Sequence, residues 1–421
     1  MAYHVPYPFH QDSNYFYFTG LNEPNGVLAI VVDIHPASDQ NDPEFTHHEH
    51  LFLEVRSQES ELWDGPSLRL STAAELTGVS AEPLTYFPNF LKSYAEGAYL
   101  WYAPLVHPFF DKKPLNRLVF SEILKARDFF SVNKGNVFDP DPLIDRLRIV
   151  KSPKEINLMR AAACATAKCM KSIMKTSHPD ISESTLYSCL EFQARSQGLL
   201  LGYPPVIAGG DRANTIHYLK NDALIKDGEL VLVDVGCRAC GYTADVTRTW
   251  PVNGCYTPAQ RILHEILERV QHKCAAAACP ETSLADLHRL MVAELERNLR
   301  QEKIIPKTNS LSLVQKICPH HIGHFIGLDI HDTPKIPISR RFEPGMVFPL
   351  EPGVYMRPEF GQLGVPKEFL GLGLRIEDDF VINDSGKAER LTEDLPTQCS
   401  EIEAIIRSEA CETTHGRSVR S

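Results

Sequence analysis

The sequence predicts an α+β fold in two domains, residues 1–140 and 147–410, and three observations support this prediction. The first domain is rich in aromatic residues and short apolar runs. The second opens on a strong helix start and combines long helical periods with short strands. A doubly wound parallel sheet requires strict alternation of helices and strands, and these helices and strands do not alternate strictly. The 421 residues are enough for two or three domains.

Short apolar runs rich in aromatic and β-branched residues predict strands in the first domain. They cover 14–21 (NYFYFTGL), 26–33 (GVLAIVVD) and 50–55. Asn, Pro and Gly between 22 and 26 predict a turn. The segment 139–151, which is proline-rich and then charged, is interpreted as the linker between the domains.

Three helix starts in the second domain place an N-capping side chain before a helical period. Ser152 precedes Pro153 and Glu155, which is a capping box with proline in the first turn. Thr257 and Ser283 open two further helices of about five turns or more. Strand-like apolar segments lie between and after the helices, at 229–236, 241–250, 345–350 and 373–382.

Composition excludes several classes of protein. The formal charge is −11, from 43 Lys and Arg against 54 Asp and Glu, and no basic run could follow a phosphate backbone, so we expect no nucleic-acid partner. No uncharged apolar stretch is long enough to span a membrane. The eleven cysteines all lie at or after Cys164, which predicts free thiols in a reducing compartment. Residues 1–11 resemble neither a signal peptide nor a transit peptide, so we expect no targeting signal in this chain.

Two aspartates interrupt apolar strands of the second domain. Asp234 lies in LVDVG and Asp245 lies in TADVTRT. A carboxylate buried in a strand is costly unless it is paired, hydrogen-bonded or bound to a cation. Two carboxylates on neighbouring strands indicate a shared cation, and capping of each by a nearby Arg or amide is the alternative.

Four histidines crowd the apolar segment 319–332, and histidine is the commonest metal ligand near neutral pH. His320 and His324 are four residues apart, which places them on one face of a helix or a strand. Glu351 follows an apolar strand between two prolines. Glu377 lies two residues after Arg375, so a buried Arg–Glu pair is the alternative to a metal ligand there.

Four carboxylates and one imidazole are enough for two divalent ions if some of the carboxylates bridge them. This arrangement is typical of hydrolases, in which a hydroxide shared by the two ions is the nucleophile at neutral pH. Oxygen-rich ligation with a single nitrogen suits Mn, and also Co, Fe or Zn.

Five motifs in one order, LVDVG, TADVTRTW, HIGHFIGLDIHD, LEPGVY and LRIEDD, resemble those of the pita-bread metallopeptidases, and among them aminopeptidase P (Xaa-Pro aminopeptidase). The similarity runs over residues 1–405 and implies a creatinase-like α/β domain before the pita-bread domain. Segments 18–24 (FTGLNEP), 61–66 (ELWDGP) and 203–205 (YPP) look closest to mitochondrial-type members, which implies a mitochondrial or cytoplasmic location. Family members usually carry further residues before His10, so we expect this first domain to lack its first strand and helix.

The resemblance implies five metal ligands: Asp234, Asp245, His324, Glu351 and Glu377. Asp245 and Glu377 would bridge the two ions. Glu351 would also act as the general base and acid. Arg375 would orient Asp245 from behind.

The resemblance also implies the residues that meet the substrate. His320 and His331 would stabilise the developing oxyanion and hold the substrate. His217 would line the pocket, and Tyr203 would contact the substrate.

The implied activity is release of the N-terminal residue from peptides with proline in the second position, by a homodimer that carries two Mn²⁺ ions. A prolidase restricted to Xaa-Pro dipeptides would share the same ligands and stays open. Methionine aminopeptidase is less favoured, because it does not need the extra N-terminal domain. A non-catalytic pita-bread module that binds peptides is the alternative from another class, although such modules typically lack some of the ligands.

Two weaker signals have ordinary interpretations. The run from His47 to His50 (HHEH) is interpreted as a solvated loop rather than a metal site. Cys237 and Cys240 form a single CxxC without the second pair that a zinc ribbon needs, so we expect a hairpin turn with two free thiols.

Overall fold

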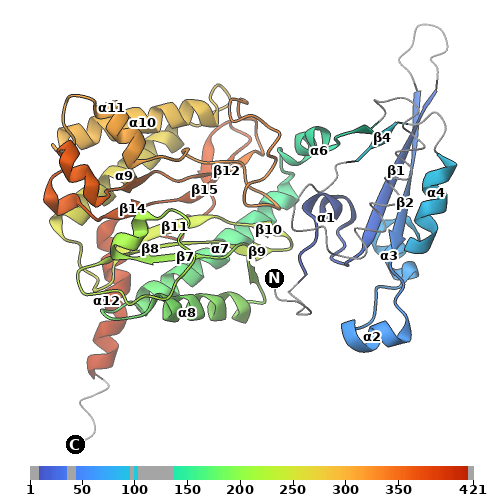
Figure 1. Cartoon of the computed structure of the whole chain (residues 1–421), viewed down its shortest axis with the longest axis horizontal. Helices are drawn as coiled ribbons and strands as arrows, with labels where there is room; N and C mark the ends of the chain where they lie inside the picture. The colour runs from blue at the N-terminus through green and yellow to red at the C-terminus, as the bar shows by residue number, and fades with distance from the viewer. Residues whose placement is uncertain (1–8, 36–43, 95–98, 103–136, 416–421) are drawn as a thin grey trace, which may run out of the picture. The chain divides into compact units, whose positions relative to one another are not determined.

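The computed structural model describes residues 9–35, 44–94, 99–102 and 137–415 (Figure 1). The chain divides into two compact units, Met1–Ile144 and Asp145–Ser421. Both units combine helices with small sheets, whose described pairings are antiparallel in the C-terminal unit and mixed parallel and antiparallel in the N-terminal unit, so the predicted α+β class is confirmed.

The N-terminal unit is built on a three-stranded sheet of β1 (Gly26–His35), β2 (Glu44–Leu53) and β3 (Ser80–Pro83). Successive residues of β2 face opposite sides of the sheet. Leu51 and Leu53 therefore pack into one small core, and Phe52 packs into another. Its other described elements are α1 (Ser13–Thr19), α2 (Gln58–Asp64), α3 (Leu70–Thr77), η1 (Leu84–Tyr86), α4 (Phe87–Ser93), β4 (Leu100–Trp101) and β5 (Val137–Phe138). The boundary between the two units falls within the next helix, α6 (Asp141–Arg148).

Two segments of this unit are helical where the sequence predicted otherwise. The strand predicted over 14–21 is wrong, because the Asp12 side chain accepts the Tyr15 N–H at 2.9 Å and starts α1. The segment 139–151, expected to be the linker, does contain the boundary between the two units, but residues 141–148 of it form the helix α6. The capping signal at Asp12 was hidden by the aromatic run that follows it.

The histidine run is also placed differently from the prediction of a solvated loop. His47 to His50 lie within β2, where pairing with β1 sets His47 opposite Val32. The ring of His50 packs on Phe90 at 4.6 Å between centroids. The strand ladder decides this conformation: the partner strand was predicted over 26–33, but its pairing with residues 44–53 was not.

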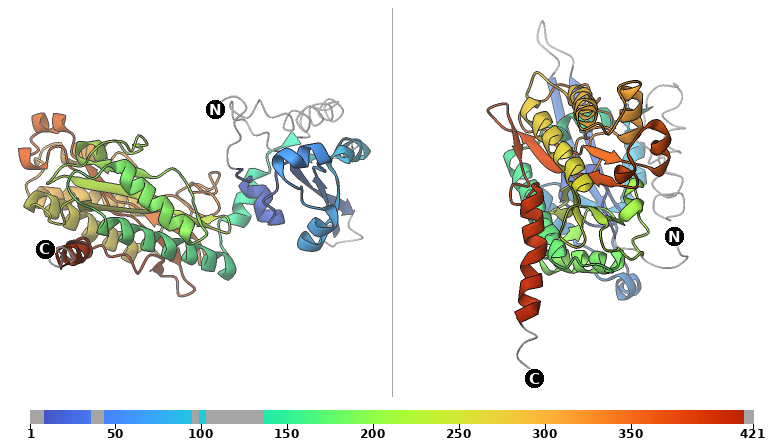
Figure 2. Two further views of the ribbon diagram at one scale, coloured as in Figure 1. Left: turned by 90° about the horizontal axis from the view of Figure 1, so that it is seen from below. Right: turned by 90° about the vertical axis from the view of Figure 1, so that its left-hand side faces the viewer.

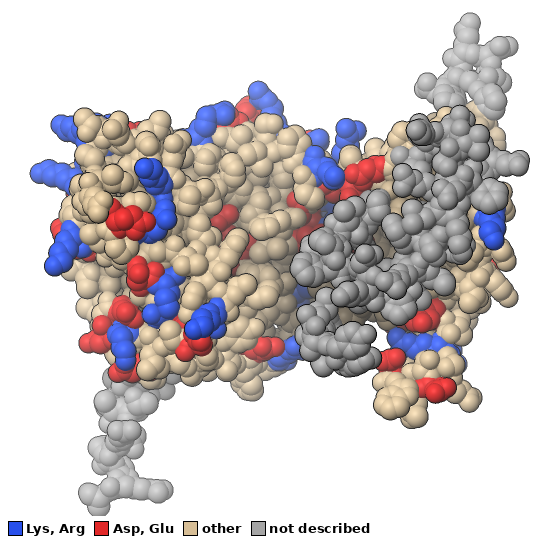
Figure 3. Space-filling model, in the orientation of Figure 1, with Lys and Arg blue, Asp and Glu red and all other residues tan. Residues whose placement is uncertain are grey.

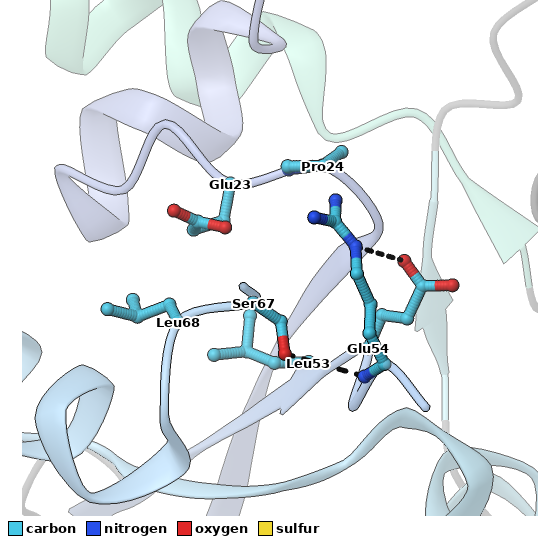
Figure 4. A pocket seen from close by; sticks show the side chains of 7 residues that line it. Glu23, Pro24, Leu53, Glu54, Ser67 and Leu68 are labelled. Atoms are coloured by element: carbon cyan, nitrogen blue, oxygen red, sulfur yellow. Dashed lines mark hydrogen bonds and ion pairs between the residues drawn. The ribbon is translucent and has the colours of Figure 1, made fainter. Parts of the chain in front are cut away.

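A small cavity of this unit lies near Glu23 and Pro24 (Figure 4). Arg56 lines it, with its N–H donating to Ser67 Oγ at 3.4 Å and its Nε 3.9 Å from a carboxylate oxygen of Glu54. The cavity has a volume of about 10 Å³, which is enough for about one water molecule. The cavity is too small for a ligand.

The C-terminal unit holds its strands between two groups of helices (Figure 1). One group is α9 (Pro258–Ala277), α10 (Leu284–Gln301) and α11 (Ser310–Ile317), and the other is α7 (Pro153–Lys175) and α8 (Glu183–Ser196). The strands are β6 (Leu200–Leu201), β7 (Val206–Gly209), β8 (Leu230–Val235), β9 (Cys237–Ala239), β10 (Tyr242–Thr243), β11 (Val246–Pro251), β12 (Val347–Leu350), β13 (Gly353–Tyr355), β14 (Gly373–Arg375), β15 (Asp378–Ile382) and β16 (Ala388–Arg390). Short helices η2 (Gly210–Asn214), η3 (Pro358–Leu363) and η4 (Lys367–Phe369) and the final helix α12 (Cys399–His415) complete the unit.

The three predicted helix starts are confirmed. Ser152 and Thr257 each form a capping box, and the Ser283 side chain accepts the N–H of Asp286. The predicted hairpin at the CxxC is confirmed as β9 and β10, with Cys240 at φ 46° in the turn. The end of α12 extends beyond the other elements of its unit (Figure 2). In the described part of the chain, no helix has both the length and the apolar character needed to cross a bilayer.

Antiparallel pairings gather the chain segments that carry the predicted ligands. β8 lies between β7 and β11, and Asp234 is opposite Thr247. β12 ends just before Glu351 and pairs with β15, while β13 pairs with β14. The strand predicted over 373–382 is two strands, broken at 376–377, so Glu377 lies where one pairing ends and the next begins.

His264 gives this unit a predictable pH dependence. Its buried ring on α9 bonds the carbonyl of Thr397 at 2.7 Å, and burial lowers its pKa to about 4. The unfolded chain takes up this proton near pH 6.5, so the folded state loses stability as pH falls from about 6.5 to 4, by about 3 kcal/mol at most. In urea titrations the difference in unfolding free energy between the wild type and His264→Gln should therefore shrink by up to that amount between pH 7 and pH 4. A difference that is constant across this range would contradict the assignment.

Candidate metal centre

The two aspartates lie on strands that approach each other closely. Asp234 is in β8, and Asp245 immediately precedes β11. Gly236 permits the approach, because an added Cβ there would lie 1.6 Å from the carbonyl oxygen of Ala244. The Tyr203 hydroxyl lies 2.6 Å from Oδ1 of each aspartate and can donate its proton to either. The chain thus holds two carboxylates beside one phenol.

Three of the predicted ligands form a compact cluster. One ligand atom from each of Asp245, His324 and Glu377 lies within 4.8 Å of the others. His324 Nε2 is 3.4 Å from Asp245 Oδ2 and 4.0 Å from Glu351 Oε1. Its Nδ1 faces the carbonyl of Phe325 at 3.2 Å, which leaves Nε2 directed at the carboxylates.

The histidine segment 319–332 is an irregular loop, so the helix or strand expected for it is wrong. The loop runs alongside the end of β12 instead, because the Glu351 N–H donates to the carbonyl of Ile322 at 2.8 Å. Gly323 allows this close contact, since an added Cβ would lie 2.0 Å from the carbonyl oxygen of Pro349. The glycine of HIGH is therefore needed to bring the histidines against the strand that ends at Glu351.

Arg375 holds the cluster from behind through several bonds. Its Nη2 donates to Asp234 Oδ2 at 2.5 Å, its Nε to Thr247 Oγ1 at 3.0 Å, and its Nη1 to the Tyr355 hydroxyl at 2.8 Å. The predicted orientation of Asp245 by this residue is therefore wrong, and Asp234 is the carboxylate that it orients. The guanidinium is almost completely buried, so solvent screens its charge only weakly from the carboxylates of the site.

The carboxyl groups of the site repel one another. Burial raises the pKa of Glu351 to about 7 and that of Glu377 well above its usual range, and the charge of Asp245 adds to both shifts. The pKa of Asp234 is raised by burial and by Asp245 as well. Burial lowers the pKa of His324, but its bond to Asp245 and the negative charges of Asp245 and Glu351 together outweigh this and raise the pKa to about 9.

This electrostatic arrangement fits bound divalent cations. Buried carboxylates that raise one another's pKa are stabilised as anions when a cation lies between them. The donor set is rich in oxygen and contains one imidazole nitrogen, which are hard and intermediate ligands. The residues present therefore fit the divalent ions that the sequence predicts.

The other predicted histidines lie around this cluster. Burial and the charge of Arg375 lower the pKa of His320 to about 4, so its ring is neutral at pH 7. Its Nδ1 faces the carbonyl of His321 at 2.8 Å and its Nε2 the Tyr355 hydroxyl at 3.0 Å, which fixes Nε2 as the acceptor. Its Nδ1 also lies 3.6 Å from Glu351 Oε2.

His331 and His217 are both exposed. The ring of His331 lies edge-on to His324, with 4.5 Å between the centroids. Partial burial, then the charge of His324, lowers the pKa of His331, and His217 acts in the same direction. His217 is therefore within electrostatic reach of the cluster, although it makes no hydrogen bond to it among the described residues.

Several residues of the site were not found from the sequence. The Thr247 hydroxyl donates to Glu377 Oε2 at 2.6 Å, and Asp379 Oδ2 accepts the backbone N–H of Asp245 at 3.0 Å. The buried Arg248 donates to the carbonyl oxygen of Glu377 at 2.7 Å. Thr247 lies two residues after Asp245, and this strand spacing was the signal that could have identified it. The other two are revealed only by contacts between distant segments.

Comparison with known proteins bears on this centre directly. Residues 157–384 match metallopeptidase family M24, and residues 1–101 match the aminopeptidase P N-terminal domain. The chain belongs to metallopeptidase family M24. Among relatives of this family, Xaa-Pro aminopeptidase 3 of Rattus norvegicus is 39% identical over 96% of this chain and 78% of its own length. Intermediate cleaving peptidase 55, mitochondrial, of Arabidopsis thaliana is 31% identical over 96% of this chain and 76% of its own.

Solved structures of M24 members give the same result. Aminopeptidase P from E. coli with the inhibitor Pro-Leu superimposes with a TM-score of 0.84 at 29% identity, over 97% of this chain and 92% of that one. The predicted architecture, a pita-bread domain after an aminopeptidase P N-terminal domain, is therefore confirmed.

Proposed function

We propose that the protein is a metal-dependent aminopeptidase that releases the N-terminal residue from peptides with proline in the second position. The observation that supports this proposal is the cluster of Asp245, His324 and Glu377, with Glu351 4.0 Å from His324 and Asp234 sharing the Tyr203 hydroxyl with Asp245. Membership in family M24 and the names of the relatives support the same activity.

We propose two divalent ions, most consistent with Mn²⁺, held by Asp234, Asp245, His324, Glu351 and Glu377. Asp245 and Glu377 would bridge them, since their oxygens cluster with His324. When bound, the ions supply a water of lowered pKa and polarise the scissile carbonyl. The oxygen-rich donor set supports Mn²⁺ over metals that prefer thiolates.

The chain's own groups would then move the proton and hold the peptide. Glu351, which lies 4.0 Å from His324, would act as the general base that later returns the proton to the leaving imino nitrogen of proline. Both nitrogens of neutral His320 are engaged, Nδ1 by the carbonyl of His321 and Nε2 by the Tyr355 hydroxyl, so this residue would hold the histidine segment beside Glu351 and leave the oxyanion to His331. The exposed His331 and His217 would contact the substrate. Tyr203, whose hydroxyl lies against Asp234 and Asp245, would contact it as well.

Proline in the second position poses a physical problem that such a centre avoids. An Xaa-Pro bond has no N–H, so enzymes that grip an extended backbone through that group bind it poorly. A cluster that captures the free amino end and the scissile carbonyl does not need that hydrogen. This argument supports an exopeptidase acting at the first bond.

The partners and location follow from weaker observations. Basic and acidic side chains are interspersed on the face of the C-terminal unit seen in Figure 3, which supports a peptide rather than a nucleic-acid partner. The relative named as mitochondrial supports a mitochondrial location. The homodimer expected from the sequence stays a prediction.

Peptide cleavage tests the proposed function. After loading with Mn²⁺, the protein should release the first residue from an Xaa-Pro-Yaa tripeptide and leave a Met-Ala-Yaa peptide intact, and EDTA should abolish the reaction. Cleavage of Xaa-Pro dipeptides alone would assign a prolidase and overturn the proposal. No cleavage of either, with less than one metal ion bound per chain, would indicate a non-catalytic binding module.

A further inference from the structure

A buried glutamate lies behind the segment that carries His217. Glu183 is the first residue of α8, and its side chain is fully buried. The segment from Gly209 to Ala223 wraps around this carboxylate, and His217 lies in its middle. We call residues 209–223 the His217 loop.

Both oxygens of Glu183 are saturated by donors from this loop. Oε1 accepts the backbone N–H of Gly209 at 2.9 Å and Arg212 Nε at 2.7 Å. Oε2 accepts the Tyr218 hydroxyl at 2.9 Å and the N–H of Ala223 at 3.0 Å. One carboxylate therefore ties together the start, the middle and the end of the His217 loop.

The chemistry of these four bonds requires a carboxylate. All four partners are donors, so only a group with two acceptor oxygens and no hydrogen satisfies them. The negative charge is stabilised by the Arg212 guanidinium and by its position at the N-terminus of a helix of 14 residues. Burying an anion carries a desolvation penalty, and an apolar residue would fill the same space without that penalty. Packing alone therefore does not account for a glutamate at this position.

The loop is attached to strands of the metal centre at its start and at Asn214. β7 ends at Gly209 and pairs with β8, with Val206 opposite Asp234. Asn214 Nδ2 donates to the carbonyl of Gly371, just before the strand that ends at Arg375. A shift of the loop would therefore move His217 relative to the cluster, while the ligands themselves are fixed by other strands.

We propose that Glu183 is a positioning residue for substrate binding: its carboxylate fixes the His217 loop and so holds His217 against the bound peptide. This inference rests on the proposed function, in which His217 contacts the substrate. Glu183 does not touch the substrate or the ligand atoms, so its removal should weaken peptide binding and leave metal binding and the chemical step intact.

The variant Glu183→Gln tests the inference. Its amide nitrogen would face two of the four donors and could not accept their hydrogen bonds. Buried donors without acceptors would loosen the His217 loop and weaken peptide binding by about tenfold. We expect KM for the tripeptide to rise about tenfold, with kcat within about twofold and the bound metal unchanged. Tyr218→Phe, which removes a single donor and is less disruptive to folding, should raise KM by about threefold. Glu191→Gln, on the exposed side of the same helix, is the matched control and should match the wild type.

A double-mutant cycle with His217→Ala separates positioning from a general loss of stability. If Glu183 acts through His217, Glu183→Gln should change KM by less than about twofold once His217 is absent. A full additive effect in that background, or a fall in kcat with KM unchanged, would overturn the inference. An inactive wild type with Mn²⁺ bound would instead overturn the proposed function, so the two failures are distinguishable.

Discussion

Asp245→Asn is expected to purify as a folded protein that holds less than one divalent ion per chain and has lost nearly all activity. The substitution keeps the side chain's size and the acceptor that meets Tyr203, but it replaces an anionic oxygen near His324 by an amide nitrogen. A bridging ligand must offer an oxygen to each of two ions, which Asn cannot do. The loss of activity should exceed the ~10–100-fold typical of losing an outer hydrogen-bond partner.

Elemental analysis after dialysis and peptide assays with added Mn²⁺ would measure both effects. Asp384→Asn, an exposed aspartate in the turn before β16, is the matched control for the change of charge. Full metal occupancy together with wild-type turnover in Asp245→Asn would remove this residue from the proposed ligand set.

Glu351→Gln should separate catalysis from metal binding. The amide keeps one oxygen for an ion, but it can neither take up nor return a proton. Because general acid–base catalysis contributes about 10²–10⁴-fold, kcat should fall by that factor while KM and the metal content change little.

Single-turnover and steady-state assays on metal-loaded protein would measure this loss. Glu368→Gln, an exposed glutamate on η4, serves as its control. If Glu351→Gln turned over at the wild-type rate, another group would have to carry the proton, and His320 beside it would be the next to substitute.

The identity of the candidate site could be predicted from the sequence because its chemistry is unusual for the local context. Asp234 and Asp245 stand out since carboxylates within apolar strands require a partner. The helix starts at Ser152, Thr257 and Ser283 were also predictable, because a cap depends on residues only three positions apart.

The path of the histidine loop could not be predicted. The spacing of His320 and His324 suggested a helix or a strand, whereas the loop is shaped by contacts with β12 through Ile322 and Gly323. Likewise, the histidine run at His47 became a strand through its pairing with β1. The composition of a segment does not show which other segment it pairs with, even where, as for residues 26–33, the partner strand itself is predicted.

The sequence by itself determined which side chains could bind metal and that helices and strands would be mixed in two domains, because donor type and short-range capping are local properties. Only the tertiary structure decided that Arg375 orients Asp234, that Thr247 supports Glu377, and that Glu183 ties down the His217 loop. These contacts join residues more than twenty positions apart. Their geometry is set by strand register and by the close backbone approaches that glycine allows. Both depend on the whole fold, because all of these contacts must be satisfied together in one structure.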